Sequence, residues 1–193
     1  MKKQLLFLPM MLLLLTGCGG GQEGKTGAEA LAVEIRGEYM AMTGYSLQAQ
    51  VNADYGQRVY DFTLSVTNDG EETAVVIREP EMLSGVTARI HGEEGTLEYD
   101  DLSLETGFLD GESLSPVSAL PTLMEAARTQ YIDRCTLTDG VLEVHCADPE
   151  QNSGTGQEVT LWFDAQTHAL TGGEISQDGR RVIACQITEF TKT

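Results

Sequence analysis

Cys18 is the residue whose type and setting point most clearly to chemistry. A thiolate is a nucleophile, and the two residues before this cysteine, Thr16 and Gly17, are small enough for an enzyme to approach the chain closely. Two lysines and an apolar run, residues 5–15, precede them. This run is much shorter than the roughly 20 residues that a helix needs to cross a bilayer. It therefore predicts an export signal over residues 1–17 rather than a membrane span.

The sequence Leu15-Thr16-Gly17-Cys18 resembles the lipobox of bacterial lipoproteins, in which an aliphatic residue and two small residues precede cysteine. The resemblance implies cleavage between Gly17 and Cys18 and a covalent lipid on the Cys18 thiol, with no other cofactor. Two or three acyl chains would hold the protein on a membrane, whereas one chain binds only marginally. We therefore expect a lipid-anchored protein on the extracytoplasmic face of the cell membrane. The alternative is an ordinary secretory signal with a chance cysteine.

The charge of the chain excludes one class of partner. The 193 residues carry 12 basic and 30 acidic side chains, a net charge of −18, which becomes −20 without the two lysines of the signal. Such a surface repels nucleic acid and anionic lipid headgroups, so no nucleic-acid partner is expected. Calcium or a basic partner stays open, although the acids are scattered and form no calcium-loop motif. A solvated acidic surface explains them equally well.

Catalytic motifs are missing from the sequence. The three histidines fall in separate regions, and His145 and Cys146 are neighbours in a predicted strand, so they face opposite sides of the sheet. Neither the Gly-x-Ser-x-Gly nor the His-Glu-x-x-His pattern occurs. Glu98, Asp100 and Asp101 could belong to a glycosidase-like cleft, but a solvated edge strand accounts for them as well. We predict neither an enzyme nor a metal site.

The remaining cysteines offer one possible disulfide. Cys135 and Cys146 flank a hairpin predicted at residues 139–140, in a chain whose export would permit a bridge. That turn places Cys135 opposite Val144, so a bridge to Cys146 would be diagonal and strained. Either these two cysteines are bridged, or they and Cys185 are three free thiols that pack as small hydrophobic residues.

Two helices are expected in a chain that is otherwise made of strands. The glycine-rich residues 19–27 predict a flexible tether, so that residues 18–27 form a lipidated linker. Apolar residues at helical spacing predict a first helix over residues 28–43. Ser118 as N-cap, with Pro121 in the first turn, predicts a second helix over residues 118–130.

Alternating apolar and polar residues predict 11 strands with no helix between most successive pairs. The expected ranges are 45–52, 60–67, 73–78, 86–90, 95–99, 102–105, 131–137, 141–147, 158–163, 170–175 and 180–190. An antiparallel sheet of this size must curl rather than stay flat. We therefore expect an α+β fold, mainly antiparallel β: a curled, incomplete β-barrel of about 11 strands with two helices covering its open face.

This layout resembles the LolA-like superfamily of bacterial lipoprotein-handling proteins. The local likeness lies in Val-Thr-Leu-Trp-Phe-Asp at 159–164, followed by Thr167, Leu170, residues 173–175 and residues 178–180. The superfamily includes outer-membrane lipoprotein carriers, RseB-type sigma regulators and mycobacterial lipid-carrying lipoproteins. The resemblance implies a single LolA-like half-barrel domain over residues 28–193, with an apolar concavity that holds acyl chains.

Two functions follow from this resemblance. In the first, the anchored domain binds an acyl chain or a lipidated partner in the concavity, whose possible lining is Leu47, Phe62, Leu64, Val66, Leu123, Val144, Leu161, Phe163 and Ile183. In the second, the same residues fill the core, and the scaffold is a protein-interaction or envelope-signalling module, of the germination or sigma-regulator type, without a lipid ligand. A continuous apolar hollow favours the first function, and a packed interior with an exposed apolar edge favours the second. The expected partners are the membrane, through the anchor, and a lipid, a lipoprotein or an envelope protein.

Overall fold

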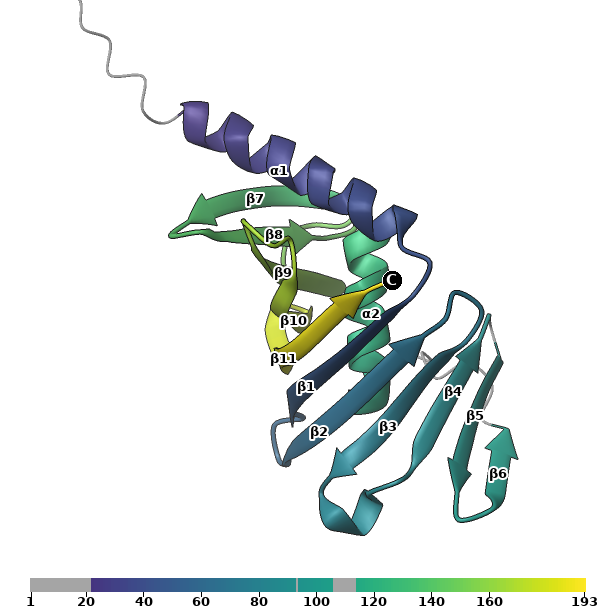
Figure 1. Cartoon of the computed structure of the whole chain (residues 1–193). Helices are drawn as coiled ribbons and strands as arrows, with labels where there is room; N and C mark the ends of the chain where they lie inside the picture. The colour runs from purple at the N-terminus through teal and green to yellow at the C-terminus, as the bar shows by residue number, and fades with distance from the viewer. Residues whose placement is uncertain (1–21, 93, 106–113) are drawn as a thin grey trace, which may run out of the picture.

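A computed structural model of the chain describes residues 22–92, 94–105 and 114–193 (Figure 1). The predicted signal, the cleavage site and Cys18 lie outside these residues. No helix in the described part of the chain is both long enough and apolar enough to cross a membrane.

The described chain forms one antiparallel sheet of 11 strands that does not close, with two α-helices, which confirms the expected curled, incomplete barrel. The sheet order is β6-β5-β4-β3-β2-β1-β11-β10-β9-β8-β7. The first strands are β1 (Tyr45–Asp54), β2 (Val59–Asn68), β3 (Thr73–Glu79), β4 (Thr87–His91), β5 (Glu94–Tyr99) and β6 (Leu102–Glu105). The others are β7 (Ile132–Thr138), β8 (Val141–Cys146), β9 (Gln157–Asp164), β10 (Leu170–Gln177) and β11 (Arg180–Lys192), and a short 3-10 helix, η1 (Glu81–Leu83), follows β3.

The strand order divides the sheet into two meanders. Strands β1 to β6 run outward to one edge and β11 back to β7 to the other, and the two halves are joined by the pairing of β1 with β11. In β1, buried residues alternate with exposed or half-exposed ones along the whole strand, as the sequence pattern predicts. The helix α2 (Pro116–Arg128), which lies between β6 and β7 in the sequence, packs across the inner face of the sheet (Figure 1).

The first helix, α1 (Gln22–Ala41), begins six residues before the predicted start at Ala28. Part of the expected tether, residues 22–27, is therefore helical. The helix packs against β7, β8 and α2 through a buried face that includes Ala28, Ala32 and Tyr39. A helix held by such packing extends at little cost once its first turns have formed.

The second helix also begins earlier than predicted. Ser115, not Ser118, is its N-cap: the Ser115 hydroxyl accepts a hydrogen bond from the Val117 amide at 3.3 Å, and Pro116 occupies the first turn. Ser118 is buried inside the helix, and its hydroxyl donates to the Ser115 carbonyl at 2.9 Å. Pro121 consequently lies in the helix interior and not in its first turn.

Candidate functional site

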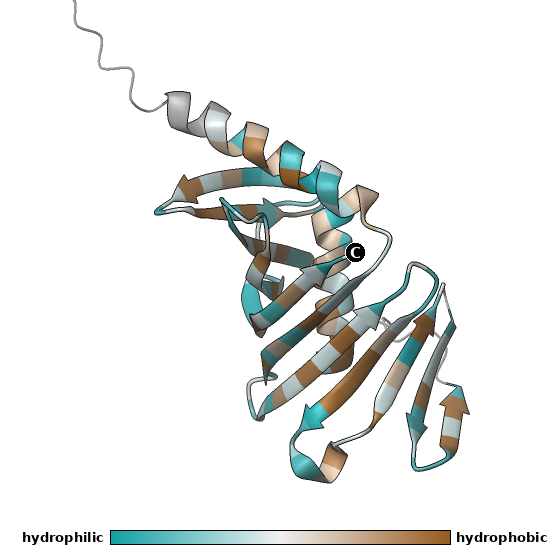
Figure 2. Cartoon of the chain, in the orientation of Figure 1, coloured by the Kyte–Doolittle hydropathy of each residue, from teal (hydrophilic) through white to brown (hydrophobic). Residues whose placement is uncertain are grey.

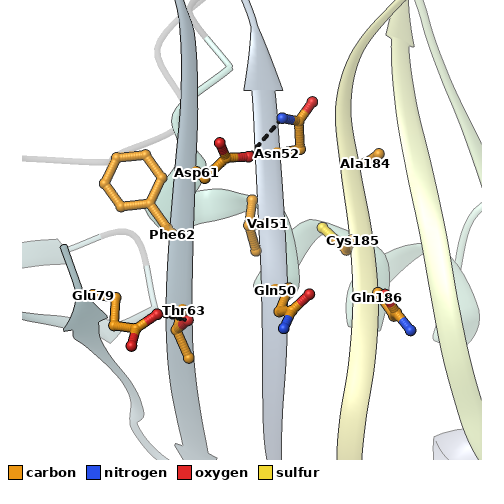
Figure 3. A pocket seen from close by; sticks show the side chains of 10 residues that line it. All are labelled: Gln50, Val51, Asn52, Asp61, Phe62, Thr63, Glu79, Ala184, Cys185 and Gln186. Carbon is orange, nitrogen blue, oxygen red and sulfur yellow. Dashed lines mark hydrogen bonds between the residues drawn. The ribbon is translucent and has the colours of Figure 1, made fainter.

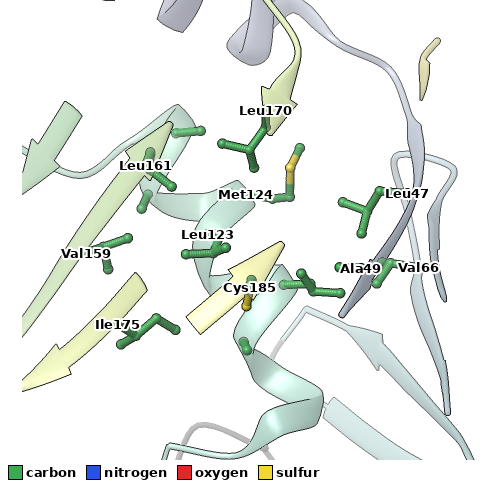
Figure 4. Close-up of a cluster of buried hydrophobic side chains, with 14 of the residues drawn as sticks. Leu47, Ala49, Val66, Leu123, Met124, Val159, Leu161, Leu170, Ile175 and Cys185 are labelled. Atoms are coloured by element: carbon green, nitrogen blue, oxygen red, sulfur yellow. The ribbon is translucent and has the colours of Figure 1, made fainter. Parts of the chain in front are cut away.

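The inner face of the sheet is the first candidate site, because the predicted lining residues all point to it. Eight of the nine belong to one buried core, and Phe62 packs against that core half-buried. Figure 4 shows Leu123 and Met124 of α2 inserted among Leu161, Leu170 and Leu47 of the sheet. The structure thus brings the predicted residues together, but as the packed contact between α2 and the sheet.

The close approach of α2 to the sheet depends on one glycine. A Cβ placed on Gly173 of β10 would lie 2.9 Å from both Cδ atoms of Leu123 and 2.8 Å from the Thr160 carbonyl oxygen. Real Cβ atoms do not come that close to other atoms. Leu123 therefore occupies the space that a side chain at position 173 would take, and the helix fills the sheet at this level.

An open groove lies beside α2, between the helix and strands β1 to β4. It has a volume of about 420 Å³, within the range of small-ligand sites. Its apolar lining includes Tyr45, Ile90, Pro121 and Met124, and polar side chains of both the helix and the sheet make up the rest. We call it the α2 groove. The Arg128 guanidinium lies 5.6 Å from the centre of the Tyr45 ring and donates to the Tyr39 carbonyl at 3.1 Å.

A second hollow, of about 410 Å³, lies over strands β2, β1 and β11 (Figure 3). Gln50 and Asn52 alternate with the buried Val51, so their side chains are on the sheet face opposite the core. Asn52 donates to the Asp61 carboxylate at 2.7 Å, and Thr63 donates to Glu79 at 2.7 Å. The carboxylates of Asp61 and Glu79 thus already have hydrogen-bond partners within the hollow.

The inner apolar face continues beyond the core toward β6. Directly paired residues lie on the same face of a sheet, and the pairing Leu47–Val66–Val75–Ala88–Leu97–Leu104 crosses six strands. The first four side chains of this row are buried and Leu97 is half-buried, but Leu104 is 64% exposed. The helix α2 packs against β1 to β3 and β9 to β11. The row therefore becomes exposed where it reaches β6.

Three large apolar side chains form the exposed end of this face: Tyr99 (51% exposed), Leu102 (74%) and Leu104 (64%). We call them the β6 patch. Tyr99 pairs with Leu102, so all three share the inner face. Figure 2 shows apolar bands on β6 at the outer edge of the sheet. The sequence marks Leu102 and Leu104 only as a short alternating strand, and no pattern in it signals that they are uncovered.

An acidic turn adjoins the β6 patch. Asp100 and Asp101 form the β5–β6 turn, with φ angles of 49° and 65°. Glu98 accepts a hydrogen bond from Arg89 at 2.8 Å. The three acids thus belong to a solvated strand edge and its turn, one of the two interpretations of the sequence.

Two histidines lie among carboxylates. His145 is buried, with its ring nitrogens 3.5 Å from Asp133 and 3.4 Å from Glu158, and its Nδ1 makes no hydrogen bond in the structure. His168 Nδ1 lies 2.6 Å from the Glu38 carboxylate. The charged neighbours that the structure gives these two histidines are thus carboxylates.

Only one described group of side chains could hold a metal ion: Glu34, Glu38 and His168, whose ligand atoms lie within 4.8 Å of one another. The Glu38 carboxylate is already bonded by the Lys192 ammonium at 2.6 Å and by His168. The Lys192 hydrogen bond, and then that of His168, lower the pKa of the Glu38 carboxyl group. The arrangement is that of an ion-pair network that joins α1, the β9–β10 turn and β11.

The three described cysteines are free thiols, so the possible Cys135–Cys146 disulfide is absent from the structure. Cys135 pairs with Val144, as predicted, and a bulge near the start of β7 places Ile132 opposite Cys146. Cys146 Sγ instead lies 4.0 Å from the Ala126 carbonyl oxygen of α2. Burial raises the pKa of the Cys185 thiol to about 12.

No protein-family model and no curated protein sequence matches the chain. Solved structures that resemble it include a LolA superfamily protein from Nitrosomonas europaea, at 13% identity, over 85% of this chain and 92% of that chain, with a TM-score of 0.45. The Mycobacterium tuberculosis lipoprotein LppX is similar at 17% identity over 84% and 95% of the two chains, with a TM-score of 0.44. The Clostridioides difficile complex of the CwlD amidase with the GerS lipoprotein contains a chain similar at 16% identity, over 86% and 92%, with a TM-score of 0.39.

Proposed function

We propose that this chain is a lipid-anchored, extracytoplasmic protein that works by binding another protein, without a lipid in its interior and without a catalytic step. One observation carries the proposal. The helix α2 fills the inner face of the sheet, while the apolar row of that face continues uncovered to the edge strand β6.

The filled interior argues against an acyl-chain carrier. Ligand sites for drug-sized molecules need a hollow of about 300 to 1,000 Å³ that encloses most of the ligand. Here the side chains that would line such a hollow are buried against Leu123 and Met124. An acyl chain could enter this space only if α2 moved away from the sheet.

The exposed β6 patch supports a protein partner. Large apolar side chains that cluster on a surface with a polar rim are typical of protein contact sites. Edge strands are commonly protected by lysine, by proline, by other charges or by being very short; β6 is short and carries Glu105, but residues 94–105 contain no lysine and no proline. The patch therefore has the properties of a surface that another chain covers.

The anchor is part of the same proposal. A covalent lipid on Cys18 would hold the domain at the outer face of the membrane, and the acidic domain would be repelled by anionic headgroups. The Cys18→Ala substitution is expected to release the protein from the membrane fraction. Retention of the variant in membranes until detergent is added would contradict lipid anchoring.

The binding function is tested by a photo-crosslinking side chain at Leu104 of the membrane-anchored protein. Leu137 on β7, which is 43% exposed at the opposite edge of the sheet, is the matched control. We expect a discrete protein adduct from position 104 and none of the same mass from position 137. Lipid adducts at position 104, or the same adducts at both positions, would contradict the proposal.

The α2 groove supports a second candidate, in which it binds one acyl chain at the surface of the core. Its apolar residues could contact the chain, and Arg128 would face a carboxylate or phosphate at one end. Substituting Thr122, which lines the groove, by Trp should fill it and abolish lipid binding. If lipid binds equally well to the Thr122→Trp protein, the groove is not the lipid site.

A further inference from the structure

Among the described residues, the strand β6 (Leu102–Glu105) has no strand on one of its two sides. It is the last strand of the sheet, and within residues 22–92, 94–105 and 114–193 it pairs only with β5. The opposite edge strand, β7, is flanked by α1. An edge without a neighbour presents backbone N–H and C=O groups to which an extended segment of another chain can add.

The two faces of this edge differ in chemistry. Leu102 and Leu104 lie on the inner, apolar face, so Ser103 and Glu105 lie on the outer face. A strand that adds to β6 would place alternate side chains beside these two sets. Its apolar residues would contact the β6 patch, and its other residues would face the acidic side.

The charge of this region indicates which residue types of the added strand suit the outer face. Residues 94–105 contain five carboxylates, Glu94, Glu98, Asp100, Asp101 and Glu105, and no lysine or arginine. Only Glu98 forms an ion pair in the described structure, with Arg89 at 2.8 Å. Basic side chains opposite such carboxylates stabilise a strand pair, and like charges directly opposite destabilise it. A second copy of β6 would bring acid against acid, in a protein with a net charge of −18.

We infer that β6 binds an extended segment of a protein partner in which basic residues alternate with apolar ones, and that the segment adds to the sheet as a twelfth strand. The inference rests on the proposed protein-binding function and names the surface and the chemistry of the partner. Because β6 has four residues, the strand contact is short, and the affinity of an isolated peptide should be modest.

The test uses a fluorescent eight-residue peptide, (Lys-Val)₄, titrated into the full lipidated protein in a non-ionic detergent while fluorescence anisotropy is measured. We expect saturable binding that weakens as salt is raised, because the charges are exposed. The peptide (Glu-Val)₄ should not bind. Equal or tighter binding of the acidic peptide would overturn the inference.

A second peptide tests strand addition itself. Methylation of alternate backbone amides on the (Lys-Val)₄ edge that would face β6 removes the donors but keeps the side chains and the charge. We expect this peptide to bind at least tenfold more weakly. Equal binding would show attraction by charge alone and would overturn the inference.

Substitutions in the protein test whether the peptide binds at β6. Leu104→Lys removes an apolar contact and adds a like charge, so it should weaken binding of the peptide at least tenfold, whereas Leu137→Lys on β7 should leave binding unchanged. Leu104→Ser, which adds no charge, should weaken binding several-fold and guards against a folding defect in the lysine variant. Equal losses in the Leu104→Lys and Leu137→Lys proteins would overturn the assignment to β6.

Two outcomes separate this inference from the proposed function. If position 104 crosslinks to a protein but the (Lys-Val)₄ peptide does not prefer β6, the inference fails and the proposed function stands. If position 104 crosslinks to lipid, the proposed function fails as well. A dimer in light scattering that Leu104→Lys dissociates would show that a second copy covers β6 and would overturn the basic partner.

Discussion

Leu123 of α2 occupies the space above Gly173 of β10, 2.9 Å from the position of a Cβ on that glycine. This contact sets the distance between the helix and the sheet. It is therefore the relationship that decides whether the half-barrel is hollow or filled.

The Gly173→Ala substitution should push α2 away from the sheet. The added methyl group meets both Cδ atoms of Leu123 and the Thr160 carbonyl oxygen, so we expect a loss of about 1–3 kcal/mol in the free energy of unfolding, measured in urea. Gly37→Ala on α1 is the matched control, because a Cβ there has no atom within 4 Å. The control should stabilise the protein by about 0.5–1 kcal/mol. Equal stability of the two variants would contradict this close packing.

The Leu123→Ala substitution should create the hollow that the natural protein lacks. Removal of a fully buried leucine costs about 2–5 kcal/mol in the free energy of unfolding. If the variant remains folded, it should bind an apolar dye that the natural protein does not bind, as a fluorescence titration would reveal. Dye binding of the same strength by both proteins, even after Thr122→Trp has filled the α2 groove, would show that the interior was already open.

Glu38 should make stability depend on pH in the acid range. Its pKa is lowered in the folded protein, first by the Lys192 hydrogen bond and then by His168, so its contribution is present above the ordinary carboxyl pKa and is lost as pH falls through the lowered pKa. Because Glu38 is 39% exposed, we expect at most about 1 kcal/mol. The difference in unfolding free energy between the natural protein and Glu38→Gln should shrink as pH is lowered from 6 to about 3. A constant difference would argue against these ion pairs.

Thiol labelling should distinguish free cysteines from a disulfide. Burial raises the pKa of the Cys146 and Cys185 thiols, so both should resist alkylation in the folded protein at pH 8, while the half-buried Cys135 reacts slowly. In denaturant without reductant, Cys135, Cys146 and Cys185 should all react, as peptide mass spectrometry would show. Labelling of Cys185 alone would instead indicate a Cys135–Cys146 bridge.

Much of the fold can be predicted from the sequence because strand alternation is a local signal. Each predicted strand overlaps an observed one, and the turn at Asp139 and Gly140 adopts the expected positive φ angles. The start of α2 was predictable too, since Ser115 followed by Pro116 is itself an N-cap and first-turn pattern. Ser118 also fits the N-cap pattern in the sequence, and only the tertiary structure shows that Ser118 is buried inside the helix.

Whether the inner face of the sheet is filled or hollow could not be predicted in the same way. Alternation indicates that Leu64 and Leu161 face inward, but both a filled core and a lined cavity need inward apolar residues. The choice depends on how close α2 approaches, which is set by Gly173, a residue with no side chain to contribute to a pattern. The exposure of Leu102 and Leu104 likewise depends on how far α2 extends over the sheet.

The most direct test of a filled interior is native mass spectrometry of residues 22–193, which include both helices and all 11 strands, purified without detergent. We expect the mass of the bare chain, unchanged after incubation with fatty acid or phospholipid. A bound mass in the lipid range that is lost on organic extraction, and that persists when Thr122→Trp has filled the α2 groove, would contradict a filled interior. That result would make lipid the ligand of this half-barrel.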